Sequence, residues 1–163
     1  DPLCIFTGKP WVVQGRGRLD PWVASNWILP DLDVFLLDTQ RQGHTGQLVD
    51  HFHRRMEDPR QRKTLTEDYI PLVNKAVEDT VNGVLQFETL KILSFSQLNY
   101  FSDMIPASFL DTWKQGLESG LYACKLCGSG GGGMMLGFAK DFDQVSRFLA
   151  GRVKISPVTI KKQ

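Results

Sequence analysis

The stretch Lys125-Leu-Cys-Gly-Ser-Gly-Gly-Gly-Gly-Met134 places five glycines in the six positions from Gly128 to Gly133, with only Ser129 between them. Apolar runs typical of strands lie on both sides, Leu121–Leu126 before it and Met134–Phe138 after it. Glycine loses more conformational freedom on folding than any other residue, so such a dense run needs a structural reason. We expect a strand, a loop and a strand. The loop either adopts left-handed backbone angles or comes very close to a ligand or another segment.

The rest of the sequence predicts an α+β sandwich, with helices packed on one face of a mostly antiparallel sheet. Thr45 and Thr66 are predicted to cap helices at their start, and Gly120 to cap one at its end. Ile70, Val73, Val77, Val81 and Leu85 are predicted to form the buried face of the second helix. The expected elements are a hairpin over residues 11–19, a strand over 33–38, helices over 45–56, 66–85, 89–101, 106–120 and 141–150, and a last strand over 153–160.

Composition narrows the class of protein. The 163 residues carry a net charge of +1, with 42% hydrophobic and 23% charged residues, as in an average globular domain. This balance gives no sign of a nucleic-acid-binding surface, and no apolar run reaches the length of a membrane span. The three cysteines fit a reducing cytoplasm and no disulfide framework. Cys124 and Cys127 lack a second ligand pair, so we expect buried, reduced thiols and no metal site.

Two phosphate-binding motifs can be tested against the glycine run. Gly128, Gly130 and Gly133 formally satisfy G-x-G-x-x-G, but that dinucleotide motif requires a helix next, and a strand-like segment follows here. A Walker A loop would end in Gly-Lys-Ser/Thr, whereas Met134 and Met135 occupy those places. Two interpretations stay open: a flexible hairpin linker, or a loop whose backbone N–H groups or bare Cα surface line a polar or anionic ligand.

The segment Tyr122–Gly133 resembles the third motif of the GHMP small-molecule kinases, and its four final glycines are most similar to those of the mevalonate kinases within that family. Phe35-Leu-Leu-Asp-Thr-Gln-Arg-Gln-Gly-His-Thr-Gly-Gln-Leu-Val49 is similar to the family's strand, polar loop and Thr-capped helix. The resemblance covers most of the chain from about Val34 onward. It departs from the family pattern at Cys127 and Met134, which affects the identity of the acceptor more than that of the family.

The resemblance implies a ferredoxin-like C-terminal, substrate-side domain over residues 1–163, with residues 1–30 as the tail of a preceding domain or linking strands. It implies that the chain is part of an ATP-dependent kinase that phosphorylates a hydroxyl of mevalonate or a similar acceptor and is inactive alone. The N-terminal kinase domain would be the partner and would bind most of the ATP and Mg²⁺, with neither expected in this fragment. The site residues implied are Asp1 as the catalytic aspartate, the loop Gly128, Ser129, Gly130, Gly131, Gly132 and Gly133 against phosphate and substrate, and Thr45 and Lys125 in substrate binding.

Alternatives remain at this stage. Phosphomevalonate, a sugar or a sugar phosphate are other acceptors within the family. Outside it, the chain would be a non-enzymatic α+β module that holds a small ligand or a partner at the glycine loop. We expect the chain to bind a small-molecule substrate and to bind neither nucleic acid nor a membrane. A homodimer stays open, and the expected location is cytoplasmic. Arg54, Arg55, Arg60, Arg62 and Lys63 are interpreted as a solvated basic run.

Overall fold

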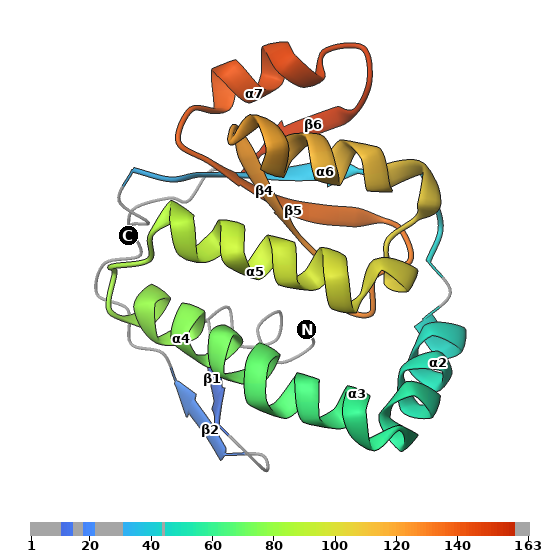
Figure 1. Ribbon diagram of the computed structural model, residues 1–163. Coiled ribbons are helices and arrows are strands. Elements are labelled where there is room, and N and C mark those ends of the chain that lie inside the picture. Colours follow the sequence, from blue (N-terminus) through green and yellow to red (C-terminus); the bar gives the residue numbers. More distant parts are fainter. Residues whose placement is uncertain (1–10, 15–17, 22–30, 44, 159–163) are drawn as a thin grey trace.

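The computed structural model describes residues 11–14, 18–21, 31–43 and 45–158, and it has an α+β fold (Figure 1). Asp1, Cys4 and His44 lie outside the described residues. In chain order the elements are β1 (Trp11–Gln14), β2 (Arg18–Pro21), β3 (Asp33–Asp38), α2 (Thr45–Glu57), α3 (Pro59–Thr64), η1 (Leu65–Tyr69), α4 (Ile70–Val81), α5 (Phe87–Tyr100), η2 (Ser102–Met104), η3 (Ala107–Phe109), α6 (Leu110–Ser119), β4 (Tyr122–Lys125), β5 (Met134–Ala139), α7 (Phe142–Leu149) and β6 (Lys154–Pro157).

The main sheet has the strand order β4-β5-β3-β6, and every neighbouring pair is antiparallel. A strand, a helical segment, two strands, a helix and a last strand follow each other in the chain, which is the split β-α-β arrangement of ferredoxin-like folds. The predicted α+β, ferredoxin-like fold is therefore confirmed. Strands β1 and β2 form a separate antiparallel pair, with Trp11 opposite Pro21.

One face of the main sheet carries the larger core. Side chains alternate between the two faces of a strand, so Phe35 and Leu37 of β3 point to the same side. Both are fully buried there, in one cluster with Trp113 of α6 and Val145 of α7. Helices α6 and α7 thus cover this face. Helix α6 ends at a glycine, as predicted, and α7 begins after the N-cap Asp141. Gly120 adopts a left-handed φ of 68° directly after α6.

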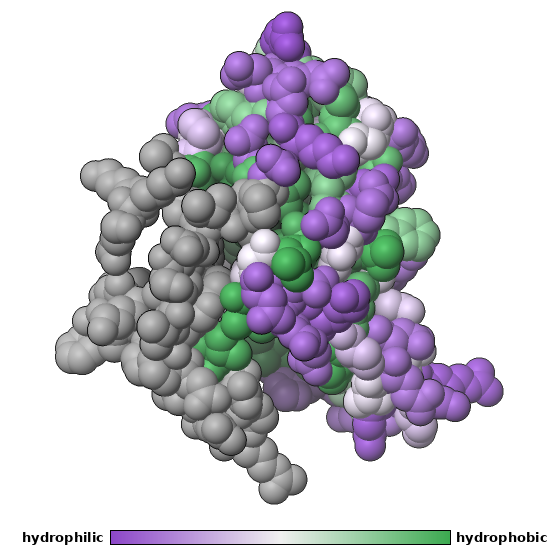
Figure 2. Space-filling view, turned by 90° about the vertical axis from the view of Figure 1, so that its left-hand side faces the viewer, coloured by the Kyte–Doolittle hydropathy of each residue, from purple (hydrophilic) through white to green (hydrophobic). Residues whose placement is uncertain are grey.

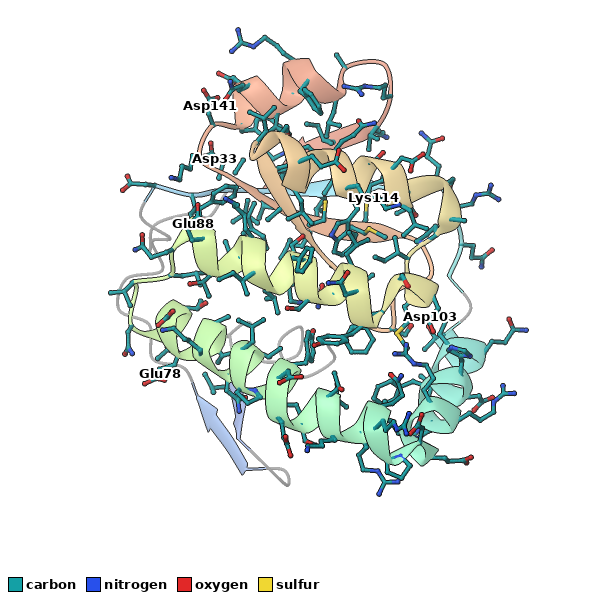
Figure 3. The ribbon with its side chains drawn as sticks, viewed as in Figure 1. Asp33, Glu78, Glu88, Asp103, Lys114 and Asp141 are labelled. Carbon is teal, nitrogen blue, oxygen red and sulfur yellow. The ribbon has the colours of Figure 1, made fainter. Side chains whose placement is uncertain are left out.

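Two aspartates meet at the start of α7 (Figure 3). Asp141 is the N-cap, and its Oδ1 accepts a hydrogen bond from the backbone N–H of Gln144 at 2.9 Å. Asp33, at the start of β3, accepts the N–H of Phe142 at 2.9 Å. Negative charge is favourable at a helix N-terminus, because the free N–H groups and the helix dipole are positive there. Both contacts hold α7 against the first strand of the sheet.

Helix α5 lies along the free edge of β4. An edge strand exposes unpaired N–H and C=O groups that another chain could pair with. Here the hydroxyl of Ser94 accepts the N–H of Cys124 at 3.1 Å, and the amide oxygen of Gln97 accepts the N–H of Leu126 at 2.9 Å. Both polar side chains are buried. Two α5 side chains thereby take the hydrogen-bonding place of a fifth strand.

The predicted second helix differs from the observed one in its start and in its buried face. Asp58 caps α3, and α3, η1 and α4 run on as one helical segment. Thr66 therefore lies inside a helix, where its hydroxyl donates to the carbonyls of Arg62 and Lys63, and the prediction that it is an N-cap is wrong. The buried or half-buried apolar residues of this segment are Leu65, Tyr69, Leu72, Val73 and Ala76. Of the predicted face, Val73 is half-buried and Leu85 is buried beyond the end of α4, whereas Ile70, Val77 and Val81 are exposed.

Apolar side chains also reach the surface at Val84 in the α4–α5 connection and at Ile92 and Phe95 on α5. Figure 2, seen from the side of the α4–α5 connection, shows hydrophobic residues at the surface between hydrophilic ones. Among the described residues, no helix has the length and apolar character needed to cross a bilayer.

Candidate functional site

The glycine loop joins β4 to β5 and is held at two points by other parts of the chain. The N–H of Gly131 donates to the carbonyl of Met104 at 2.6 Å, and the N–H of Gly133 donates to the carbonyl of Arg41 at 2.6 Å. All five glycines have positive φ, from 57° at Gly128 to 151° at Gly132. Side chains other than glycine rarely take such angles. The first structural reason for the run, its left-handed backbone, is therefore present.

The second reason is close approach. A Cβ built on Gly130 would lie 2.5 Å from the carbonyl oxygen of Met104, and one on Gly132 would lie 2.5 Å from that of Arg41. On the opposite wall, a Cβ on Gly43 would lie 3.0 Å from the carbonyl oxygen of Gly130. The loop thus lies between the β3–α2 connection and η2, and the bare Cα surfaces of Gly130 and Gly132 face the protein's own backbone. A loose hairpin linker does not describe it.

Thr39 fixes the end of the loop to the end of β3. Its backbone N–H and its hydroxyl both donate to the carbonyl of Gly133, at 3.0 and 2.8 Å. The same hydroxyl accepts the N–H of Arg41 at 3.4 Å. Thr39 is buried, so these bonds are shielded from water. Thr39 was not predicted as a site residue. The available signal was its place directly after the apolar run of β3, where a hydroxyl side chain follows a buried strand.

The loop brings two predicted site residues together. The hydroxyl of Ser129 donates to the hydroxyl oxygen of Thr45 at 3.2 Å, across 84 positions of sequence. Thr45 is the first residue of α2 and is exposed, and Ser129 is half-buried. Hydroxyl groups at this place can bind the oxygen atoms of a ligand while they remain hydrogen-bonded to each other.

A cavity of ≈ 330 Å³ has Ser129 in its lining, whereas Thr45 is not part of the lining. Lys125 lies in its wall and its Nζ donates to the carbonyl of Leu126 at 3.0 Å, which leaves further ammonium protons for a ligand. Most of the wall is apolar. The complete lining is Leu48, Val49, Phe52, Tyr69, Gln97, Phe101, Met104, Lys125, Leu126, Gly128 and Ser129.

The polar groups deeper in the cavity are occupied. The amide nitrogen of Gln97 donates to the phenol oxygen of Tyr69 at 2.7 Å, while its oxygen holds the N–H of Leu126. Burial raises the pKa of Tyr69, and the hydrogen bond from Gln97 lowers it by a smaller amount, so the phenol stays neutral. The Lys125 ammonium is therefore the charged group of a largely apolar wall.

The two cysteines near the loop differ from each other. Cys124 is buried in β4, and burial raises the pKa of its thiol far above the usual range. Cys127 is exposed, so the expectation of two buried thiols is wrong for this residue. It follows the last β4 residues into the turn, where the chain leaves the sheet. Within the described ranges, no group of three or more His, Cys, Asp or Glu side chains could hold a metal ion.

One protein-family model matches a segment of the chain that includes the glycine loop. Residues 88–151 match the family described as "GHMP kinases C terminal", a segment that spans most of α5, α6, β4, the glycine loop, β5 and α7. No curated protein matches the chain. The matched segment, less than half of the chain, is thus similar to the C-terminal domain of GHMP kinases, which are ATP-dependent phosphotransferases.

Proposed function

We propose that this chain supplies the acceptor-side wall of a kinase that transfers the γ-phosphoryl group of ATP to a hydroxyl of mevalonate or a similar small acceptor. The observation that carries the proposal is the contact of Thr45 with Ser129, a residue that lines the cavity. Ser129 lies inside the segment matched to the kinase family, and Thr45 lies outside it. Two regions that resemble separate kinase motifs thus meet at one place.

The chemistry of the cavity favours a small anionic acceptor with an apolar body. Mevalonate carries a carboxylate, a methyl group and two hydroxyls. The Lys125 ammonium can pair with a carboxylate or phosphate, and Leu48, Phe52 and Leu126 offer apolar surface for the carbon skeleton. Thr45 and Ser129 are close enough together to bind the reacting hydroxyl or the phosphoryl oxygens.

In this proposal the residues act by positioning. Phosphoryl transfer requires little covalent chemistry from the protein; it requires alignment and charge stabilisation. ATP and Mg²⁺ would be held mainly by a second domain that faces the loop, and Asp1, which lies outside the described residues, remains a proposed catalytic aspartate. The chain's own contribution is to orient the acceptor hydroxyl at Thr45 and Ser129 and to hold the acceptor's charge at Lys125.

The test is a coupled assay of ADP release with the complete polypeptide that contains this chain. The acceptors compared are mevalonate, phosphomevalonate, a hexose and a hexose phosphate. We expect mevalonate to give the largest kcat/KM. Absence of turnover with all four acceptors would refute the kinase assignment, and preference for another acceptor would replace mevalonate.

Two substitutions test the site itself. Thr45→Val removes the hydroxyl and keeps the shape, and we expect kcat/KM to fall roughly a hundredfold, on the scale of lost alignment. Thr66→Val is the matched control, because the Thr66 hydroxyl bonds only to carbonyls of its own helix among the described residues. Lys125→Met should raise KM for anionic acceptors by about tenfold, the scale of one charge-assisted contact. Equal effects of the two threonine substitutions would remove Thr45 from the site.

A further inference from the structure

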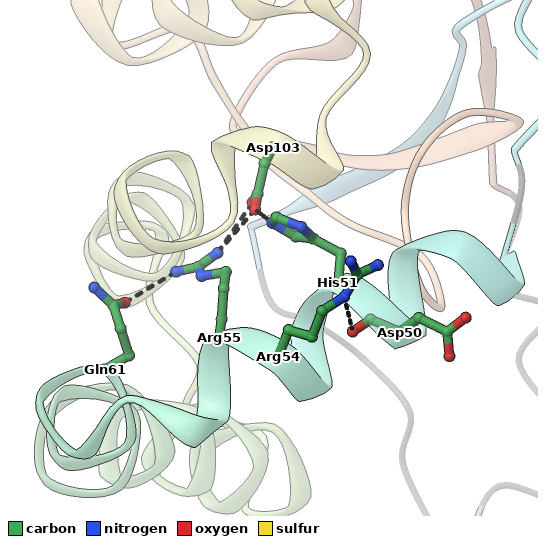
Figure 4. Close-up of polar contacts among 6 residues, drawn as sticks. All are labelled: Asp50, His51, Arg54, Arg55, Gln61 and Asp103. Atoms are coloured by element: carbon green, nitrogen blue, oxygen red, sulfur yellow. Dashed lines mark hydrogen bonds and ion pairs between the residues drawn. The ribbon is translucent and has the colours of Figure 1, made fainter.

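A second polar cluster lies outside the cavity and joins α2 to η2. Asp103 of η2 is its centre (Figure 4). Arg55 of α2 places Nη1 3.1 Å from both carboxylate oxygens of Asp103, and Nε2 of His51, one turn earlier on α2, contacts Oδ2. Arg55 also donates through Nη2 to the side-chain oxygen of Gln61 at 3.2 Å. Arg55 therefore does not belong to a merely solvated basic run.

The residue after Asp103 supports the glycine loop. Met104 is buried, and its carbonyl accepts the N–H of Gly131 at 2.6 Å. The same oxygen would lie 2.5 Å from a Cβ on Gly130. Any displacement of η2 must therefore move the loop, because no space separates the Met104 carbonyl from the loop backbone.

The loop and α2 are consequently linked twice. At the start of α2, Thr45 touches Ser129 of the loop. Farther along the same helix, Arg55 donates to Asp103, and the next residue, Met104, accepts the N–H of Gly131 in the loop. A helix is a stiff element, so the second link constrains the distance at the first.

We propose that Asp103 is a positioning residue that sets the separation between the glycine loop and α2, and with it the contact of Ser129 with Thr45. It does not touch the reacting groups. Its effect on catalysis rests on the function proposed above, whereas its effect on the loop does not. His51 and Arg55, the two partners of Asp103 on α2, were not predicted as site residues. Both are about 50 positions away from Asp103 in the chain, so the sequence gives no sign of the contact.

The other ion pairs of the described residues show why this one stands out. Lys63 with Glu67, Lys75 with Asp79 and Lys91 with Glu88 each join neighbouring turns of one helical segment, and such pairs at the surface contribute little. The Arg55–Asp103 pair spans 48 positions and joins two elements. The Arg55 side chain is only 22% exposed, so water screens it less than those lysines.

The direct test is amide hydrogen exchange in the complete polypeptide that contains this chain, read on a peptide that includes residues 127–133. Asp103→Asn keeps the shape of the side chain and removes its charge. We expect roughly tenfold faster exchange there, the order expected for coupling through a packed network. Glu88→Gln is the matched control, since Glu88 also meets its lysine through both oxygens and lies at the opposite end of α5 (Figure 3). Equal exchange in both variants would overturn the proposal.

Kinetics provides a second readout. Asp103→Asn should lower kcat about tenfold with KM for ATP unchanged, and Asp103→Glu should restore part of the loss, because a carboxylate can still reach Arg55. If Asp103→Asn does not fold, Arg55→Met replaces it, since a methionine keeps an apolar stem but removes the contacts to Asp103 and Gln61. Unchanged exchange and unchanged kcat in that variant would also overturn the proposal. A polypeptide without kinase activity would refute the proposed function, while the exchange experiment would still decide the role of Asp103.

Discussion

Gly130→Ala is the most informative single change in the glycine loop, because Gly133→Ala is a control at a residue with almost the same φ. The two residues have φ values of 74° and 70°. A Cβ on Gly130 would lie 2.5 Å from the Met104 carbonyl oxygen and 3.0 Å from Cδ2 of Leu126, whereas a Cβ on Gly133 would have no neighbour within 4 Å. The two variants therefore share the cost of the left-handed backbone and differ in packing.

The shared cost is roughly 1–2 kcal/mol, the penalty for an L-residue with left-handed angles. Gly130→Ala adds either the overpacking of a filled site, roughly 1–3 kcal/mol, or the loss of the Gly131–Met104 hydrogen bond if the carbonyl moves away, also roughly 1–3 kcal/mol. These two costs are alternatives, because moving the carbonyl relieves the clash. We therefore expect Gly130→Ala to be about 1–3 kcal/mol less stable than Gly133→Ala.

The assay is equilibrium unfolding in urea, followed by circular dichroism, for both variants and the parent protein. The midpoints should fall in the order parent, Gly133→Ala, Gly130→Ala, with similar slopes, since neither change alters the surface exposed on unfolding. Equal midpoints for the two variants would refute the argument. The loop would then not be packed against Met104, and its glycines would be needed only for their backbone angles.

Three further substitutions test the parts of the fold that hold the site. Ser94→Ala should lower the free energy of unfolding by about 1–3 kcal/mol in urea, because the N–H of Cys124 loses its partner at the buried edge of β4. Gly116→Ala should lower the melting temperature although alanine is the better helix former, because the new Cβ would lie 2.4 Å from the Tyr122 ring. Gly46→Ala is the control and should leave the melting temperature unlowered, because a Cβ at Gly46 would have open space around it. Burial raises the pKa of Cys124 above the ordinary thiol value of 9.0, so above this pH the folded state keeps a proton that the unfolded state loses. The free energy of unfolding should therefore fall as the pH rises above 9.0, by about 1.4 kcal/mol per pH unit. In the Cys124→Ala variant the free energy of unfolding should fall less steeply with pH.

The elements around the glycine run could be predicted because their signals are local. Short, continuous apolar runs predict β3, β4 and β5, and a glycine at position 120 predicts the end of α6. The buried face of α4 could not be predicted in the same way. Both Ile70 with Val77 and Tyr69 with Ala76 recur at helical spacing, so periodicity alone does not choose between them.

A tertiary contact makes that choice. Tyr69 ends the π-helical turn η1, which changes the rotation of the helix just before α4. Its phenol oxygen accepts a hydrogen bond from Gln97, and Gln97 is itself held by the N–H of Leu126 beyond the end of β4. Because Gln97 supplies a partner for its hydroxyl, the half-buried Tyr69 can face the interior without the cost of an unsatisfied polar group, and Ile70 lies on the exposed side. The deciding partners are 28 and 57 positions away from Tyr69, where sequence patterns carry no information about contact.

The structure also divides the glycine run into positions with different roles. The N–H groups of Gly130, Gly131 and Gly133 bond to carbonyls of the chain itself, so they are not available to an anion. Among the described residues, the N–H groups of Gly128 and Ser129 have no backbone acceptor, and these two residues line the cavity next to Lys125. Backbone N–H groups beside an ammonium bind carboxylate or phosphate oxygens well. In the function proposed above, an anion would therefore be bound at Gly128 and Ser129, because the N–H of Gly132, which also has no backbone acceptor among the described residues, does not line the cavity. Gly130, Gly131 and Gly133 hold this part of the loop in place through their bonds to the protein's own carbonyls.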